Sequence, residues 1–190
     1  VRGRAAGSAV SFETVLPSSS ASEGEDASRI EVSYSPDEMK LRAAARGDAS
    51  SFGTVVHRLL ETGAGLSDEE LHRLAGGLLR TEGLAVDPAD AVAACRRIFS
   101  NEVYAQSLSA SRVYREMPLV FRSGDVLVNG VIDLLYHDGS GWVLADYKVL
   151  LDPSKKSAEE LKERYKGQLD LYEEGLRKAG IEVKRKVLVI

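Results

Sequence analysis

The change in hydrophobic pattern near residue 111 constrains the fold more than any other feature of this chain. It begins a run of three stretches rich in β-branched and aromatic residues, at 111–121, 126–136 and 142–149. Short turn sequences separate them, Ser-Gly-Asp at 123–125 and Asp-Gly-Ser-Gly at 138–141, and both are typical of hairpins. The pattern therefore predicts an antiparallel three-stranded meander.

Helical periodicity lies on both sides of this meander. Before it, apolar spacing and capping residues predict helices at 35–46, at 52–62, from Ser67 onward, and at 88–100. After it, we expect a long helix over 158–178 that ends at Gly180, and then a strand over 182–190. Because a helix separates this last strand from the meander, it should pair parallel with one of the three. The predicted fold class is α/β, with N-terminal helices followed by a β-β-β-α-β core.

The chain has the length of a single domain with one hydrophobic core. Residues 1–34 are rich in Gly, Ala and Ser and predict a flexible linker or extended segment, which leaves the domain at 35–190 with its core from about residue 50.

The sequence shows no signal peptide and no apolar run near the roughly 20 residues of a membrane helix, so we expect a cytoplasmic protein with no membrane contact. Cys95 is the only cysteine, which excludes an internal disulfide and favours a packed thiol.

Three charged residues interrupt the apolar pattern of the second and third strands. Asp133 lies within the second strand, and Asp146 and Lys148 lie on one face of the third. Two carboxylates that converge among apolar residues repel each other and lose hydration unless a cation joins them, and Mg²⁺ suits such a site. The alternative is a buried ion pair between Lys148 and one of the acids, which we expect to leave the second acid without a partner. These three residues by themselves leave both interpretations open.

Asp133 followed by Asp146-Tyr147-Lys148 resembles the D…(D/E)-x-K signature of the PD-(D/E)XK nuclease superfamily. Upstream, Gly-Thr-Val-Val-His at 53–57 is similar to the G-x-x-x-H motif of its RecB-type branch, and Gln-Leu-Asp-Leu-Tyr at 168–172 is similar to the Q-x-x-x-Y motif. Within that branch, the segments around 115–119, 130–135 and 167–172 most resemble the C-terminal nuclease domain of AddA-type helicase-nucleases. The resemblance implies a restriction-endonuclease-like mixed sheet flanked by helices.

The resemblance also implies a set of metal ligands and a catalytic lysine. Asp133 and Asp146 would bind Mg²⁺, for which Mn²⁺ can substitute, together with His57 and the backbone carbonyl of Tyr147. Lys148 would orient the attacking water or help to deprotonate it. Val149 departs from the branch, where Thr or Ser usually follows the lysine, and this puts in doubt a local polar contact near the site. A single cysteine excludes the four-cysteine iron–sulfur cluster of some relatives.

Three further residues are candidates for supporting the site. Gln168 lies on an apolar helical stripe and needs a polar partner, and the resemblance implies that it positions DNA or the lysine. Tyr172 lies one turn later on the same stripe, where core packing is the alternative. Glu116 lies on the first strand near the same end of the sheet, where an ordinary surface residue is the alternative.

Three classes of function compete. The leading hypothesis is a metal-dependent DNA exonuclease of a helicase-nuclease that acts on single-stranded ends in recombination and double-strand break repair. The second is a catalytically silent module of the same fold that binds DNA or protein, and the third is an unrelated domain with a structural ion cluster. The net charge of −4 argues against DNA binding by bulk electrostatics, so any contact must be local. No phosphate-binding loop is present, so the motor must lie in a helicase domain elsewhere in the full-length chain or in a partner subunit.

Overall fold

The computed structural model of the protein describes residues 13–15, 30–34, 49–149 and 157–190. The helix predicted at 35–46 lies outside these residues, as does most of the segment predicted to be flexible or extended. The described helices are α1 (Ala49–Thr62), α2 (Asp68–Thr81), α3 (Pro88–Phe99), α4 (Glu102–Leu108) and α5 (Ala158–Lys178). The described strands are β1 (Glu13–Val15), β2 (Ile30–Ser33), β3 (Val113–Ser123), β4 (Val126–His137), β5 (Trp142–Tyr147) and β6 (Val183–Val189).

All six described strands form one mixed sheet in which β4 pairs with three neighbours. Strand β3 runs antiparallel to it along its whole length, and β5 runs antiparallel to its C-terminal half. These two ladders confirm the predicted meander. Strand β6 follows α5 and pairs parallel with β5, which confirms the predicted crossover. The sheet therefore has the mixed α/β architecture that the sequence predicted.

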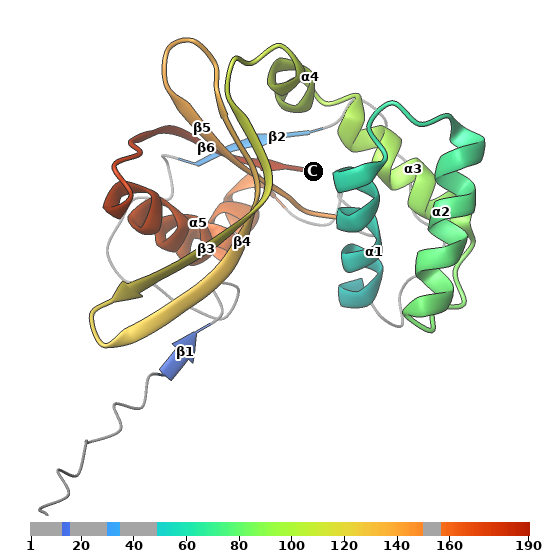
Figure 1. The fold of residues 1–190 in the computed structure, drawn as a ribbon, viewed down its shortest axis with the longest axis horizontal. Coiled ribbons are helices and arrows are strands. Elements are labelled where there is room, and N and C mark those ends of the chain that lie inside the picture. Colours follow the sequence, from blue (N-terminus) through green and yellow to red (C-terminus); the bar gives the residue numbers. More distant parts are fainter. Residues whose placement is uncertain (1–12, 16–29, 35–48, 150–156) are drawn as a thin grey trace, which may run out of the picture.

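The sheet separates two layers of helices (Figure 1). On one face the described helices α1 to α4 pack against a core that includes Phe52, Leu59, Tyr136 and Val143. On the other face, α5 is the one helix of the described residues that packs, through Leu161, Leu169 and Leu176 among others. A side chain near the centre of the sheet is consequently within reach of α1 from one side and of α5 from the other.

Capping boxes define the starts of α2 and α5. The Ser67 side chain accepts a hydrogen bond from the Glu70 N–H, and the Glu70 carboxylate accepts one from the Ser67 N–H, which completes a capping box for α2. The same reciprocal pair joins Ser157 and Glu160 at the start of α5. Because these bonds satisfy backbone groups that the helix itself cannot, they define where each helix begins.

Three short elements were not predicted from the sequence. Helix α4 has seven residues, β2 has four and β1 has three. Both strands lie within 1–34, the segment predicted to be flexible or extended. Strand β2 pairs parallel with β6, and β1 pairs parallel with Val126–Val128 of β4. Such short strands depend on a partner distant in sequence, which local periodicity does not reveal.

In the part of the chain described above, no helix has both the length and the hydrophobicity that crossing a membrane requires.

Candidate metal centre

The two predicted acids lie opposite each other where β4 and β5 meet. The ladder pairs Leu134 with Ala145, so the next residues along it are Asp133 and Asp146. Both are buried. Oδ2 of Asp133 accepts a hydrogen bond of 2.7 Å from the backbone N–H of Tyr147, which holds the carboxylate against the neighbouring strand. The convergence predicted from the strand pattern is therefore present.

His57 of α1 and Glu116 of β3 complete a cluster around Asp133. Nδ1 of His57 lies 3.4 Å from Oδ1 of Asp133 and 3.8 Å from Oε1 of Glu116. One potential ligand atom from each of the three residues lies within 4.8 Å of the others. Of the two interpretations of Glu116, the geometry fits a role at the site, because its carboxylate faces this cluster rather than open solvent.

The backbone of Glu116 departs from the strand conformation at this point. Its φ is 47°, in the left-handed region that residues other than glycine rarely adopt. The β3–β4 ladder pairs Arg115 with Leu134 and Met117 with Ile132, but has no pair between Glu116 and Asp133. Such a conformation costs of the order of 1–3 kcal/mol and is maintained by its surroundings. The ladder is therefore interrupted at the position where Glu116 and Asp133 would pair.

On the other side of Asp146 lies a polar group formed by Lys148 and α5. Nζ of Lys148 lies 2.7 Å from Oδ2 of Asp146 and donates to Oε1 of Gln168 at 3.1 Å. The amide nitrogen of Gln168 donates to Oδ1 of Asp146 at 3.0 Å and to the Tyr172 hydroxyl at 3.2 Å. Gln168 thus has the polar partners that its place on an apolar stripe required, and Tyr172 is both packed in the core and in contact with the site.

The ion pair considered from the sequence is present, between Lys148 and Asp146. We expected such a pair to leave the second carboxylate without a partner. That expectation was wrong, because Asp133 accepts from Tyr147 and faces His57. Satisfied carboxylates therefore do not by themselves decide between a metal centre and a structural ion cluster.

The charges in this cluster shift the protonation of its members. Burial lowers the pKa of His57, but the carboxylates of Asp133 and Glu116 outweigh burial and raise it to about 10. Burial raises the pKa of Asp146, with Lys148 opposing and Asp133 reinforcing the shift. Burial by itself would lower the pKa of Lys148, but the two aspartates outweigh it, so the pKa of Lys148 lies above its usual value. At neutral pH the imidazole is therefore protonated and occupies the position of a cation among the acids.

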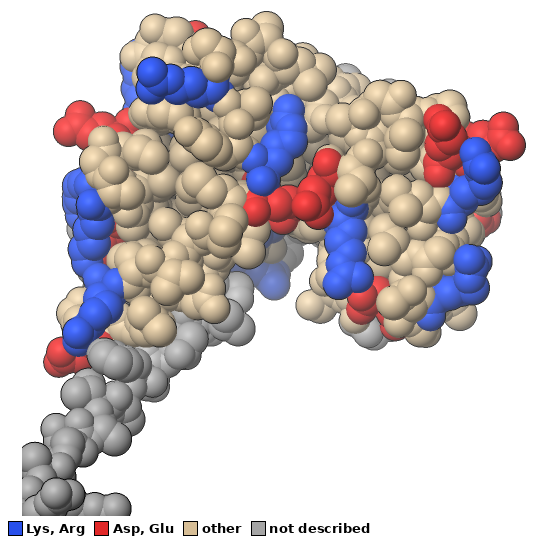
Figure 2. Space-filling view, in the orientation of Figure 1, with Lys and Arg blue, Asp and Glu red and all other residues tan. Residues whose placement is uncertain are grey.

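The donor atoms of this cluster suit a divalent cation. Carboxylate oxygens and an imidazole nitrogen are ordinary ligands for such ions. A bound cation would replace the His57 proton and offset the repulsion between the acids. In Figure 2, acidic side chains gather where the sheet meets the helices α1 to α3, and Lys and Arg side chains lie on either side of them. Positive side chains therefore lie beside the acidic ones on this face of the molecule.

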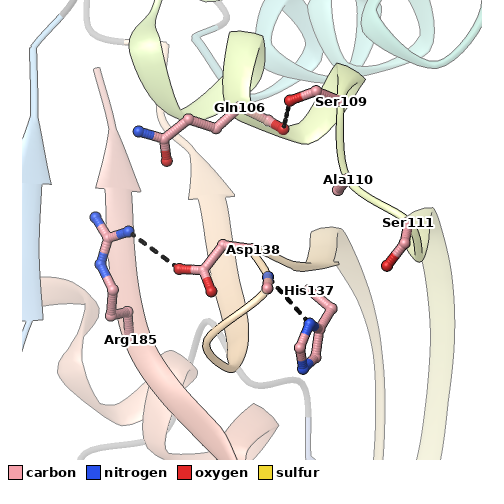
Figure 3. A pocket seen from close by; sticks show the side chains of 8 residues that line it. Gln106, Ser109, Ala110, Ser111, His137, Asp138 and Arg185 are labelled. Atoms are coloured by element: carbon pink, nitrogen blue, oxygen red, sulfur yellow. Dashed lines mark hydrogen bonds and ion pairs between the residues drawn. The ribbon is translucent and has the colours of Figure 1, made fainter.

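A separate pocket of about 470 Å³ lies at the opposite end of β4 and β5. In Figure 3 the Arg185 side chain reaches toward Asp138. The Gly139 N–H donates to Nδ1 of His137. Arg185 also forms an ion pair with Glu31. None of the residues predicted for the site lines this pocket. Its cation is already paired with carboxylates, so the pocket is no rival to the cluster around Asp133.

A comparison of the sequence with models of known protein families identifies the family of this chain. The model of the PD-(D/E)XK nuclease superfamily matches residues 34–187, which contain every predicted site residue. The chain belongs to the PD-(D/E)XK nuclease superfamily. Nucleases of this superfamily use divalent metals, in agreement with the donor set described above.

Curated relatives of this PD-(D/E)XK chain are ATP-dependent helicase/nuclease subunits of the A type. The protein from Oceanobacillus iheyensis is 29% identical over 70% of this chain, and that from Pelotomaculum thermopropionicum is 35% identical over 60%. The protein from Anoxybacillus flavithermus is 34% identical over 57%. The matched region spans 9 to 12% of the length of these relatives. These similarities confirm the resemblance to AddA-type helicase-nucleases and support a nuclease domain.

Proposed function

We propose that this chain is a Mg²⁺-dependent DNA nuclease domain and forms the exonuclease part of an ATP-dependent helicase-nuclease in the cytoplasm. The observation that carries the proposal is the convergence of Asp133, Asp146 and Lys148, with His57 from α1 on one side and Gln168 from α5 on the other. A purely structural ion cluster has no need of five polar side chains from four elements. The relatives' name supports the pairing with a motor.

We assign the metal-binding role to His57, Asp133, Asp146 and the Tyr147 carbonyl, with Glu116 as a further carboxylate within reach. A divalent cation in such a site stabilises the charge that develops on a phosphodiester and makes a bound water more acidic. The Tyr147 N–H keeps Asp133 in place, and the Lys148 ammonium lies against Asp146.

We assign Lys148 to the attacking water and the phosphate. Its ammonium is held by Asp146 and Gln168, so its position is defined before any substrate arrives. Because the two aspartates raise its pKa, it is charged at neutral pH and suited to offset negative charge at phosphorus. Tyr172 fixes the amide of Gln168 through its hydroxyl, and so supports the lysine indirectly.

We further propose that the substrate is a single-stranded DNA end, delivered during repair of double-strand breaks by a helicase domain in the same full-length chain, with or without a partner subunit. The net charge of −4 gives the chain no general affinity for DNA, so delivery by a motor would compensate for weak capture.

The decisive test is degradation of end-labelled single-stranded DNA in the presence of Mg²⁺. We expect the wild type to cut, Lys148→Ala to lose at least about 100-fold in rate, and Lys184→Ala, an exposed lysine at the far end of the sheet, to cut as the wild type does. Equal background cutting by all three chains would favour the catalytically silent module.

Metal binding is tested separately by calorimetric titration with Mn²⁺. Asp133→Ala should abolish binding, whereas Asp125→Ala, a fully exposed acid in the β3–β4 turn, should leave it unchanged. An absence of heat with the wild type would leave only the structural ion cluster.

A further inference from the structure

The aromatic ring of Tyr165 lies against the proposed catalytic lysine. Nζ of Lys148 is 4.7 Å from the centroid of this ring. Tyr165 lies on α5, three residues before Gln168, so both side chains point from one helix face toward the end of β5. The sequence places Tyr165 on the apolar stripe of this helix, and its ring indeed packs at the edge of the core.

Among the described residues, Lys148 therefore contacts three groups of different chemical kind. Oδ2 of Asp146 bears a charge, Oε1 of Gln168 is a neutral acceptor, and the Tyr165 ring is an aromatic face. Asp146 is also a proposed metal ligand, so its oxygens are shared between the cation and the lysine. The ring is not a ligand for a hard divalent ion, so the metal does not compete with Lys148 for it.

Resting on the function proposed above, we infer that Tyr165 is a positioning residue that holds the Lys148 ammonium at the scissile phosphate when Asp146 binds the metal. The ring attracts the ammonium through its quadrupole without neutralising the charge. Lys148 therefore remains a full cation for the phosphate, which a carboxylate at this position would not allow. The face of the ring makes this contact and the hydroxyl does not, so phenylalanine should serve almost as well.

Arg164 complicates a simple substitution. Its guanidinium carbon lies 5.4 Å from the centroid of the same ring, and the side chain is exposed. Replacing Tyr165 with leucine therefore removes two cation contacts together. A double-mutant cycle that pairs Tyr165→Leu with Lys148→Met isolates the contact with the lysine, because Arg164 is present in all four chains.

The first experiment measures cutting of labelled DNA with saturating Mg²⁺. We expect Tyr165→Leu to lower kcat by about 10- to 100-fold with little change in KM. Tyr165→Phe should retain most of the wild-type kcat. Tyr114→Leu is the matched control, since Tyr114 stacks on Trp142 at the far end of the sheet and should leave kcat unchanged. A loss equal in Tyr165→Phe and Tyr165→Leu, or a loss in KM alone, would overturn the inference.

The second experiment follows urea unfolding of the four chains of the cycle in a chelating buffer, where no metal contributes. We expect the two substitutions to be non-additive, with a coupling of about 2- to 5-fold in the unfolding equilibrium constant. Additive effects overturn the inference. If the coupling is present but the wild type never cuts DNA, the proposed function is refuted and the contact itself is established.

Discussion

The side-chain amide of Gln168 bridges Asp146 and Lys148, donating to the carboxylate at 3.0 Å and accepting from the ammonium at 3.1 Å. A side-chain amide can serve both partners at once, because its nitrogen donates and its oxygen accepts. The bridge connects α5 to the end of β5, beside the proposed catalytic lysine. It also explains why a polar residue interrupts the apolar face of that helix.

Replacing Gln168 with leucine should keep the packing of α5 and remove the bridge. We expect kcat for DNA cutting to fall by about 10- to 100-fold, since residues that orient a metal ligand and its neighbours have effects of this size. Gln168→Glu should be at least as damaging, because it adds a negative charge beside Asp146. Steady-state cutting assays measure both. A Gln168→Leu chain with wild-type kcat would show that the bridge has no part in the reaction.

The left-handed backbone of Glu116 predicts an unusual order of stabilities. Glycine adopts a φ of 47° without strain, whereas alanine does not, so Glu116→Gly should be more stable than Glu116→Ala by about 1 kcal/mol. This reverses the usual order within a strand. Urea unfolding in a chelating buffer gives the comparison, and both variants should bind Mn²⁺ more weakly than the wild type. If alanine proves the more stable, Glu116 is not strained in solution.

Metal affinity should increase with pH. His57 has a pKa of about 10 when no metal is bound, and only its neutral form binds a cation, so binding must release its proton. Below this pKa, the apparent Mn²⁺ affinity should rise about tenfold per pH unit, for example between about pH 7 and 9. Titration calorimetry in two buffers of different ionisation enthalpy counts the protons released. His57→Gln should flatten the dependence, and an equally steep slope in that variant would assign the proton to another group.

The ion network between α5 and β6 should contribute strongly to stability. Asp170 accepts from Lys166 at 2.6 Å and from Lys186 at 2.7 Å, and both lysines are buried. Asp170→Ala would leave both ammonium groups without this carboxylate, and we expect a loss of about 3 kcal/mol in the free energy of unfolding. Asp68→Ala is the control, because the pair between Asp68 and Arg96 is exposed and should be worth less than about 1 kcal/mol. Comparable losses in the two variants would contradict the predicted role of burial.

The elements with strong local signals were predicted closely. Helix α5 has the bounds expected from the sequence, and the two hairpin turns place β3, β4 and β5 correctly. Asp133, Asp146 and Lys148 stood out because a charge within an apolar strand pattern is conspicuous. Strands β1 and β2 were missed because a segment of three or four residues is stabilised only by the neighbour to which it pairs.

The sequence alone determined the order of elements, the family resemblance and the identity of the polar residues at the site. These depend on local periodicity, turn chemistry and spacing along the chain. Only the tertiary structure decided how the residues meet: that Glu116 leaves the ladder to face His57 and Asp133, that Gln168 bridges Asp146 and Lys148, and that Tyr165 lies beneath the lysine. The physical reason is that these contacts join residues from 17 to 76 positions apart. Their distances are set by how two helical layers pack on one sheet, and no local pattern encodes that packing.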